Sequence, residues 1–324
     1  MTVFKNKKIL ITGGAGFIGT NLIRRLLQND IALKAVIHEK EPVILNKKVE
    51  YLKCDLTKME DCIKAVKGID LVFHCAANTS GAAVIEKTPL IHLTPNILMN
   101  AQLLEASYSA GVEKFLWLSS STGYPPSEGA AKEDEMMVGE PYEKYFCVGW
   151  MKRYTEVLCR IYAQKVKNPI TTIILRPTNI YGGHDDFEFA TSHVFAALIR
   201  RVIERQNPLE VWGTGENLRD LIYVGDFINA MLLAMERVHG YDVFNIGAGE
   251  VVSIKELLAI MLEVDDYRGA EIKFDPSKPT TIPVRRVDTT KAKDILGFRP
   301  QVALREGIEK TLLWYRENKF NNLR

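Results

Sequence analysis

The sequence Thr12-Gly13-Gly14-Ala15-Gly16-Phe17-Ile18-Gly19 follows an apolar run and precedes a segment whose apolar residues recur at helical spacing. Glycine at the first, fourth and seventh positions from Gly13 permits a tight turn, lets backbone N–H groups approach a pyrophosphate, and lets helix pack on strand. A strand, this loop and a helix therefore predict a dinucleotide-binding unit. A glycine-rich turn that binds no ligand is the alternative, and the strand-loop-helix context disfavours it.

Short apolar runs alternate with amphipathic stretches from Lys8 to about Arg176. This alternation is typical of a parallel sheet wrapped by helices, so we expect an α/β fold with a Rossmann-type doubly wound sheet and a smaller C-terminal region. Leu221–Tyr223 and Val243–Ile246 are expected to return to this sheet as strands, and 254–263 and 304–318 to be helices. The first strands are predicted at Lys8–Thr12, Leu33–Ile37, Val49–Lys53, Leu71–Cys75, Phe115–Ser119 and Thr171–Leu175.

The composition is that of a globular protein. Of 324 residues, 47% are hydrophobic and 25% charged, which disfavours a disordered chain and a membrane protein. Lys plus Arg is 42 and Asp plus Glu 40, so no strong field for nucleic acid is expected. Five cysteines without metal-ligand spacing predict reduced thiols, no metal site and a cytoplasmic location.

Two further segments carry cofactor signals. Cys54-Asp55-Leu56 follows the third predicted strand, where an acidic side chain can accept a hydrogen bond from adenine, and Ala76 and Ala77 leave room for a cofactor after the fourth. Together with the glycine loop, these segments resemble the extended short-chain dehydrogenase/reductase family, also called the NAD-dependent epimerase/dehydratase family. The resemblance covers almost the whole chain.

This resemblance implies a Rossmann domain over 1–177 with about 220–246, and a substrate domain over 178–219 and 247–324. His38-Glu39-Lys40 offers both a carboxylate and positive charge to the ribose, so NAD and NADP both remain open. The implied cofactor contacts are Gly13, Gly16, Phe17, Ile18, Gly19, His38, Lys40, Asp55, Leu56, Ala76, Ala77, Lys152 and Pro177.

The C-terminal half resembles one group of that family, the GDP-L-fucose synthases, through Pro177–Gly182, Ser192-His193-Val194 and Val211–Gly215. The resemblance implies a GDP-linked hexose or heptose as substrate. By the same resemblance, Arg219 and Arg285 are expected to bind the nucleotide diphosphate, and arginine suits this role because its guanidinium makes forked, charge-assisted hydrogen bonds to phosphate. Arg286 is an alternative to Arg285. A single arginine is often only a solvated surface residue. The implied substrate contacts are Asn179, His193, Arg201, Trp212, Arg219 and Arg285.

The segment Val148-Gly149-Trp150-Met151-Lys152 departs from the family at one position. Family members have a tyrosine four residues before the lysine; it exchanges a proton with the sugar, and the lysine binds the nicotinamide ribose and lowers the tyrosine pKa. Val148 cannot carry a proton. Thr122 is a second departure, since it matches a cysteine used for epimerisation in GDP-L-fucose synthases and its hydroxyl is a poor base.

Three side chains are candidates to replace the missing phenol, and with Thr122 and Lys152 they complete the predicted catalytic set. Tyr145 lies two helical turns before Lys152 if the helix begins that early, although an aromatic that packs the helix start is the commoner case. His193 titrates near neutrality and matches an acid/base histidine of the family, the alternative being a loop histidine without a catalytic role. Ser120 matches the family's serine, but a serine after a strand is often only a cap.

These features predict an NAD(P)-dependent nucleotide-sugar epimerase or oxidoreductase with atypical activity. The alternative is a catalytically silent sensor or scaffold that retained both binding sites. By the resemblance we expect a homodimer that pairs the helix of Lys152 with the helix around Leu98 to Tyr108, a pairing at which Trp150, Met151 and Tyr154 hint.

Overall fold

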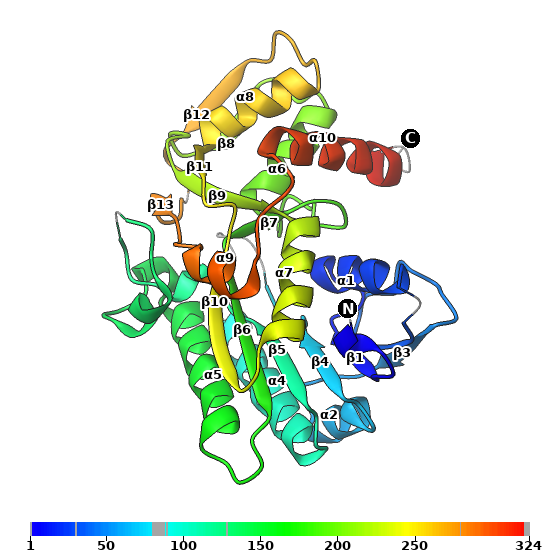
Figure 1. Cartoon of the computed structure of the whole chain (residues 1–324). Coiled ribbons are helices and arrows are strands. Elements are labelled where there is room, and N and C mark those ends of the chain that lie inside the picture. Colours follow the sequence, from blue (N-terminus) through cyan, green and yellow to red (C-terminus); the bar gives the residue numbers. More distant parts are fainter. Residues whose placement is uncertain are drawn as a thin grey trace.

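A seven-stranded parallel sheet forms the larger part of the molecule (Figure 1). A computed structural model describes residues 2–29, 31–79, 88, 90–127, 129–278 and 280–320. The strand order is β10-β6-β5-β4-β1-β2-β3, which reverses direction beside β1 as in a Rossmann fold. The strands are β1 (Ile9–Thr12), β2 (Leu33–Ile37), β3 (Val49–Lys53), β4 (Leu71–His74), β5 (Lys114–Leu118), β6 (Thr171–Pro177) and β10 (Tyr241–Ile246).

Helices cover both faces of this sheet, and each face has its own apolar core. One core joins the sheet to α1 (Phe17–Leu27), α7 (Val224–Arg237) and α9 (Thr290–Leu296). The other joins it to α2 (Met59–Val66), α4 (Leu90–Ser109) and α5 (Phe146–Gln164). The predicted doubly wound α/β fold is therefore confirmed.

A smaller lobe lies beyond the carboxyl ends of the sheet strands (Figure 1). It holds a second sheet of β7 (Asn179–Tyr181), β9 (Leu218–Tyr223), β11 (Val251–Ser253) and β13 (Val284–Arg285), and a strand pair of β8 (Leu209–Trp212) and β12 (Ile272–Asp275). Its helices α6 (Val194–Ile203), α8 (Ile254–Val264) and α10 (Leu304–Tyr315) pack around a third apolar core. Short turns of helix are η1 (Thr2–Phe4), η2 (Ser121–Gly123), η3 (Glu133–Met137), η4 (Glu143–Tyr145) and η5 (Arg316–Phe320).

One predicted strand belongs elsewhere. Val243–Ile246 returns to the main sheet as the end of β10, as expected, but Leu221–Tyr223 does not. It is the end of β9, which pairs with β7, β11 and β13 in the second sheet. Apolar patterning marks a buried strand without identifying its partner, so the expectation for Leu221–Tyr223 was wrong. The segment proposed to return to the Rossmann domain accordingly begins at Val224 rather than at about residue 220.

The helix of Lys152 begins at Phe146, and the predicted helices over 254–263 and 304–318 are present as α8 and as α10 with η5. Ser253 and Glu256 form a capping box at the start of α8, which accounts for its boundary. In the part of the chain that the structure covers, no helix is both long and apolar enough to span a bilayer.

Candidate active site

The glycine loop between β1 and α1 has the shape of a pyrophosphate cradle. Gly13 has φ +67°, and a Cβ there would lie 2.9 Å from the backbone of Ala76. A Cβ at Gly19 would lie 2.2 Å from the carbonyl oxygen of Gly13, so only glycine allows this approach of helix to strand. Gly16, the N-cap of α1, provides no side-chain cap, which leaves the first N–H groups of the helix and its dipole available for an anion.

The other predicted cofactor residues lie at the carboxyl ends of their strands. His38 and Lys40 are exposed after β2, and Pro177 ends β6. Asp55 follows β3, where hydrogen bonds from Thr57 lower the pKa of its carboxyl, so one oxygen is already bonded within its own turn. Its contact with adenine remains a prediction, as do those of Leu56, Ala76 and Ala77, which border the same edge of the sheet.

A buried polar chain that the sequence analysis missed links the glycine loop to α4 and α5. Thr12 Oγ1 accepts from Ala76 N–H (3.0 Å) and bonds His74 Nδ1 (2.7 Å), while His74 Nε2 bonds Asn100 Oδ1 (2.9 Å). Asn100 donates to Thr155 Oγ1 (3.3 Å), on the helix of Lys152. Burial lowers the pKa of His74 to about 4, so the ring is neutral and donates through Nε2.

Lys152 points at the end of β5. Its ammonium donates to the carbonyl of Leu118 (2.8 Å) and lies 4.7 Å from the centre of the Trp117 ring. Burial lowers the pKa of Lys152 to about 8, with Glu156 opposing this effect. The lysine thus remains mostly charged at pH 7 and can lose its proton slightly above it.

The turn after β5 carries Ser120 and Thr122. Ser120 Oγ accepts a hydrogen bond from the Thr122 N–H (3.1 Å), so the serine caps η2. Capping was the alternative that the sequence left open beside a catalytic role. Among the described residues, the hydroxyls of Ser121 and Thr122 are buried and have no hydrogen-bond partner. Buried hydroxyls without hydrogen-bond partners are uncommon in native structures.

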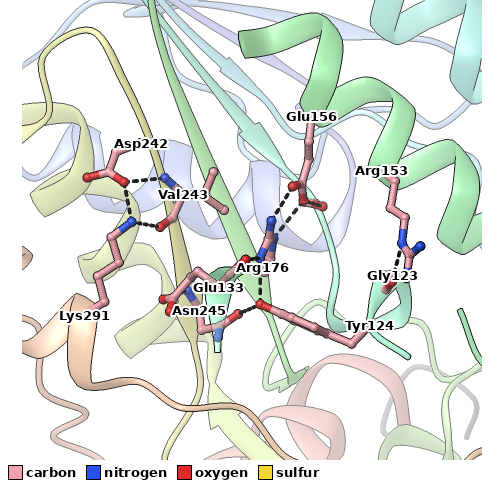
Figure 2. Close-up of polar contacts among 11 residues, drawn as sticks. Gly123, Tyr124, Glu133, Arg153, Glu156, Arg176, Asp242, Val243, Asn245 and Lys291 are labelled. Atoms are coloured by element: carbon pink, nitrogen blue, oxygen red, sulfur yellow. Dashed lines mark hydrogen bonds and ion pairs between the residues drawn. The ribbon is translucent and has the colours of Figure 1, made fainter. Parts of the chain in front are cut away.

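A buried ion pair fixes this turn to the sheet (Figure 2). Arg176 on β6 forms a two-pronged contact with Glu156 on α5, at 2.9 and 2.5 Å. Arg176 also donates to the Tyr124 hydroxyl (2.7 Å), which donates to Asn245 on β10 (2.7 Å). Glu156 is one helical turn after Lys152, so the network orients both the lysine helix and the turn of Ser120 to Tyr124.

Two arginines lie side by side on adjacent strands of the small lobe. Arg219 of β9 and Arg285 of β13 are register neighbours, and within the described residues neither forms an ion pair. Burial, then the charge of Arg285, lowers the pKa of Arg219 to about 10. Arg219 donates to Leu218, Pro283 and Thr281, whereas Nη2 of Arg285 is buried with no partner in the described chain.

Tyr145 and His193 border this arginine pair. The α5 helix begins one residue after Tyr145, so the condition on which the same-face relation to Lys152 depended is not met. The guanidinium of Arg285 instead lies 4.7 Å from the Tyr145 ring. His193 immediately precedes α6, and its side chain is exposed to solvent. Desolvation by the surrounding protein, and to a smaller extent the charge of Arg285, lowers the pKa of His193. This is the behaviour expected of a neutral histidine in a cleft.

The remaining predicted substrate residues lie on neighbouring elements. Asn179 donates to the carbonyl of Asp220 (2.9 Å). Arg201 donates to Gln206 (2.8 Å) and stacks on Phe189, and Trp212 ends β8 with 41% of its surface exposed. None of the three forms a hydrogen bond to the side chains of Arg219 or Arg285 in the described chain, and their ligand roles remain predictions. The described residues contain no cluster of His, Cys, Asp and Glu able to hold a metal ion.

Sequence and structure comparisons identify the class to which this site belongs. Residues 9–247 match the NAD dependent epimerase/dehydratase family. A probable GDP-L-fucose synthase 1 of Oryza sativa subsp. japonica is 30% identical over 97% of this chain and 93% of its own. The solved UDP-glucose 4-epimerase of Thermotoga maritima, with UDP-glucose, has TM-score 0.86 and 29% identity over 96% of this chain and 99% of its own.

A second solved UDP-glucose 4-epimerase, that of Thermus thermophilus in complex with NAD, has TM-score 0.84 and 26% identity over 96% of this chain and 99% of its own. The chain belongs to the NAD dependent epimerase/dehydratase family. It is thus a member of a family of NAD(P)-dependent nucleotide-sugar epimerases and reductases.

Acidification is expected to weaken the fold through His74. The unfolded histidine binds a proton near pH 6.5 and the folded one only near pH 4, so this contribution is complete above pH 6.5 and is lost as pH falls toward 4. The loss is roughly 3 kcal/mol at most. Denaturant unfolding from pH 7 to 4 should show a flatter pH dependence for His74→Gln than for the unaltered protein; equal slopes would contradict this assignment.

Proposed function

We propose that this protein is an NAD(P)-dependent enzyme that modifies a GDP-linked hexose or heptose, with Val148 in place of the catalytic tyrosine. The observation that carries this proposal is the Arg219–Arg285 pair, which touches the start of the lysine helix through Tyr145. A diphosphate that bridges the arginines would extend its sugar toward Lys152 and the Ser120 turn. GDP is proposed from the likeness to GDP-L-fucose synthases.

The residues of the chain have distinct proposed tasks. The glycine loop binds the cofactor pyrophosphate, and the nicotinamide, when bound, supplies or accepts hydride. Lys152 would donate hydrogen bonds to the hydroxyl groups of the nicotinamide ribose. Ser120 and Thr122 would orient the reacting oxygen of the sugar. His193 is neutral near pH 7 and accessible, so it is the proposed proton carrier ahead of Tyr145, whose ring is buried beneath Arg285.

The rival is a silent sensor that binds both ligands without turnover. Loss of catalysis alone would be expected to leave the substrate groups free to change, yet Asn179, His193, Trp212 and Arg219 all remain. The buried, lowered-pKa Lys152 also retains the character of a catalytic group. These features favour an enzyme.

Calorimetry is expected to show binding of GDP and of NAD or NADP. Arg219→Met should weaken GDP binding about tenfold or more, because charge-assisted hydrogen bonds are lost, and leave cofactor affinity unchanged. Arg268→Met, at an exposed arginine paired with Asp266, is the control and should change neither. Failure of the unaltered protein to bind either ligand would exclude both the enzyme and the sensor.

Val148→Tyr is expected to increase reduction of a GDP-4-keto sugar. A positioned general acid is worth roughly 10²- to 10⁴-fold, and the lysine and turn that would serve it are present. NAD(P)H absorbance gives the rate, and Val148→Phe supplies the ring without the hydroxyl. Equal rates for the Tyr and Phe variants would mean that another group already delivers the proton.

We also propose a homodimer formed through α4 and α5. The stripe Phe146, Trp150, Tyr154, Val157 and Ile161 on α5 is between 38% and 52% exposed, which is unusual for large apolar side chains one or two turns apart. Met151, expected in this contact, instead packs inside at 2% exposure. Light scattering should give twice 36.6 kDa, and Trp150→Glu with Tyr154→Lys should give 36.6 kDa; a monomeric unaltered protein would exclude this face.

A further inference from the structure

A groove runs along the outer face of α7, which lies between α1 and α9 (Figure 1). Arg25, in the last turn of α1, lines one side of it, and residues of the segment 297–301, after α9, line the other. The glycine loop precedes the opposite end of α1, so the groove is separate from the cofactor cradle. The α7 residues that line it are spaced by one, three or four positions and share one helical face: Asn229, Leu232, Leu233 and Glu236.

The groove has the size and the fixed walls of a site for a small molecule. Its volume is about 330 Å³, and small-molecule sites commonly measure roughly 300–1,000 Å³. The carboxylate of Asp226, in the first turn of α7, accepts hydrogen bonds from the backbone N–H groups of Gln301 and Val302 at 3.0 and 2.9 Å. These bonds hold the wall that follows α9 against α7, so the groove is preformed.

The charge of the groove favours an anion. Arg25 and Arg299 lie on opposite walls; Arg25 donates to Gln28 at the end of its own helix, and Arg299 is exposed and forms no side-chain hydrogen bond or ion pair with a described residue. Glu236, the one acidic side chain among the described lining residues, interacts electrostatically with Lys114. Two guanidinium groups around one groove match a phosphate, to which arginine makes charge-assisted hydrogen bonds.

The floor and the amides of the groove suit a flat, mostly apolar ring with polar edges. Leu232 and Phe298 are buried and Leu233 is half-buried, and together they form the apolar floor. The half-exposed amide of Asn229 forms no hydrogen bond with a described residue and offers both a donor and an acceptor. Gln301 donates to two backbone carbonyls, which leaves its side-chain oxygen as an acceptor. Amide side chains of this kind pair with the edges of nucleobases.

We propose that this groove binds a nucleoside monophosphate, with the base on the leucine floor beside Asn229 and the phosphate between Arg25 and Arg299. The proposal goes beyond the proposed function and does not rest on it. None of the lining residues belongs to the cofactor cradle, to the Arg219–Arg285 pair or to the turn of Ser120. A nucleotide in the groove therefore occupies a second site, on the helix whose first turn forms the cradle.

Calorimetry with GMP and AMP tests this proposal on the full chain in the presence of saturating NAD and GDP, which block the sites already proposed. At least one of the two nucleotides should bind, one per chain, with a Kd below about 1 mM. Inorganic phosphate and the corresponding nucleoside should each bind about tenfold or more weakly, because each lacks half of the contacts.

Arg25→Glu and Arg299→Glu should each weaken nucleotide binding about tenfold or more, since each replaces an attractive charge by a repulsive one. Both side chains reach solvent, so the variants should keep the melting temperature of the unaltered protein. Arg268→Glu makes the same change of net charge at an exposed residue outside the groove and should retain nucleotide binding.

Three results would overturn the proposal. Failure of both nucleotides to bind would exclude the site. Inorganic phosphate that binds as tightly as the nucleotides would show an anion site without recognition of the base. Nucleotide binding that persists in both Arg25→Glu and Arg299→Glu would place the ligand outside this groove. Failure of the proposed GDP-sugar function is seen separately, in the titration of the unaltered protein with GDP alone.

Discussion

The site is arranged around one constraint: two positive charges lie next to each other, and the described residues provide no counter-ion for them. Arg219 and Arg285 occupy register positions on β9 and β13, and burial with mutual repulsion lowers the pKa of Arg219 to about 10. A fold that keeps such a pair has a use for it, because an anion between the guanidinium groups converts repulsion into attraction. The arginine pair thus supports the proposal that the small lobe binds the diphosphate of the substrate.

The side chain at position 148 affects proton transfer and not the groups proposed to bind the ligands. The groups proposed to bind a dinucleotide and orient a sugar lie on helices, strands and the turns between them: the glycine cradle, the neutral His74 chain, and the Glu156–Arg176 pair that fixes the Ser120 turn. None of these depends on a phenol at position 148. If Val148 stands in place of the catalytic tyrosine, as proposed, the protein lacks that proton carrier but keeps these groups, and this is why we propose an enzyme with altered proton transfer.

Much of the main sheet could be predicted because short parallel strands are apolar throughout and end at polar turns. β2 and β3 have the predicted bounds, and the glycine loop lies where a strand and a helix meet. β9 could not be assigned to its sheet from the sequence, because its apolar pattern fits a strand of either sheet. The His74–Asn100 and Glu156–Arg176 contacts join residues far apart in sequence, so no local spacing indicated them.

The site was only partly accessible to prediction for the same reason. Lys152 and the arginines follow from family motifs, whereas the buried polar chain from Thr12 through His74 to Asn100 belongs to no motif and is visible only in the structure. Tyr145 was placed by helical periodicity, but the helix begins one residue too late to include it. Its contact with Arg285 depends on how the two lobes meet, which the sequence does not encode locally.

The most direct measurement is a crystal structure of the protein with GDP and the cofactor. The account predicts that oxygens of the diphosphate lie within hydrogen-bond distance, about 2.7–2.9 Å, of both Arg219 and Arg285. GDP bound elsewhere, with Arg219 still donating to Thr281 and Pro283 and no anion between the two arginines, would contradict it.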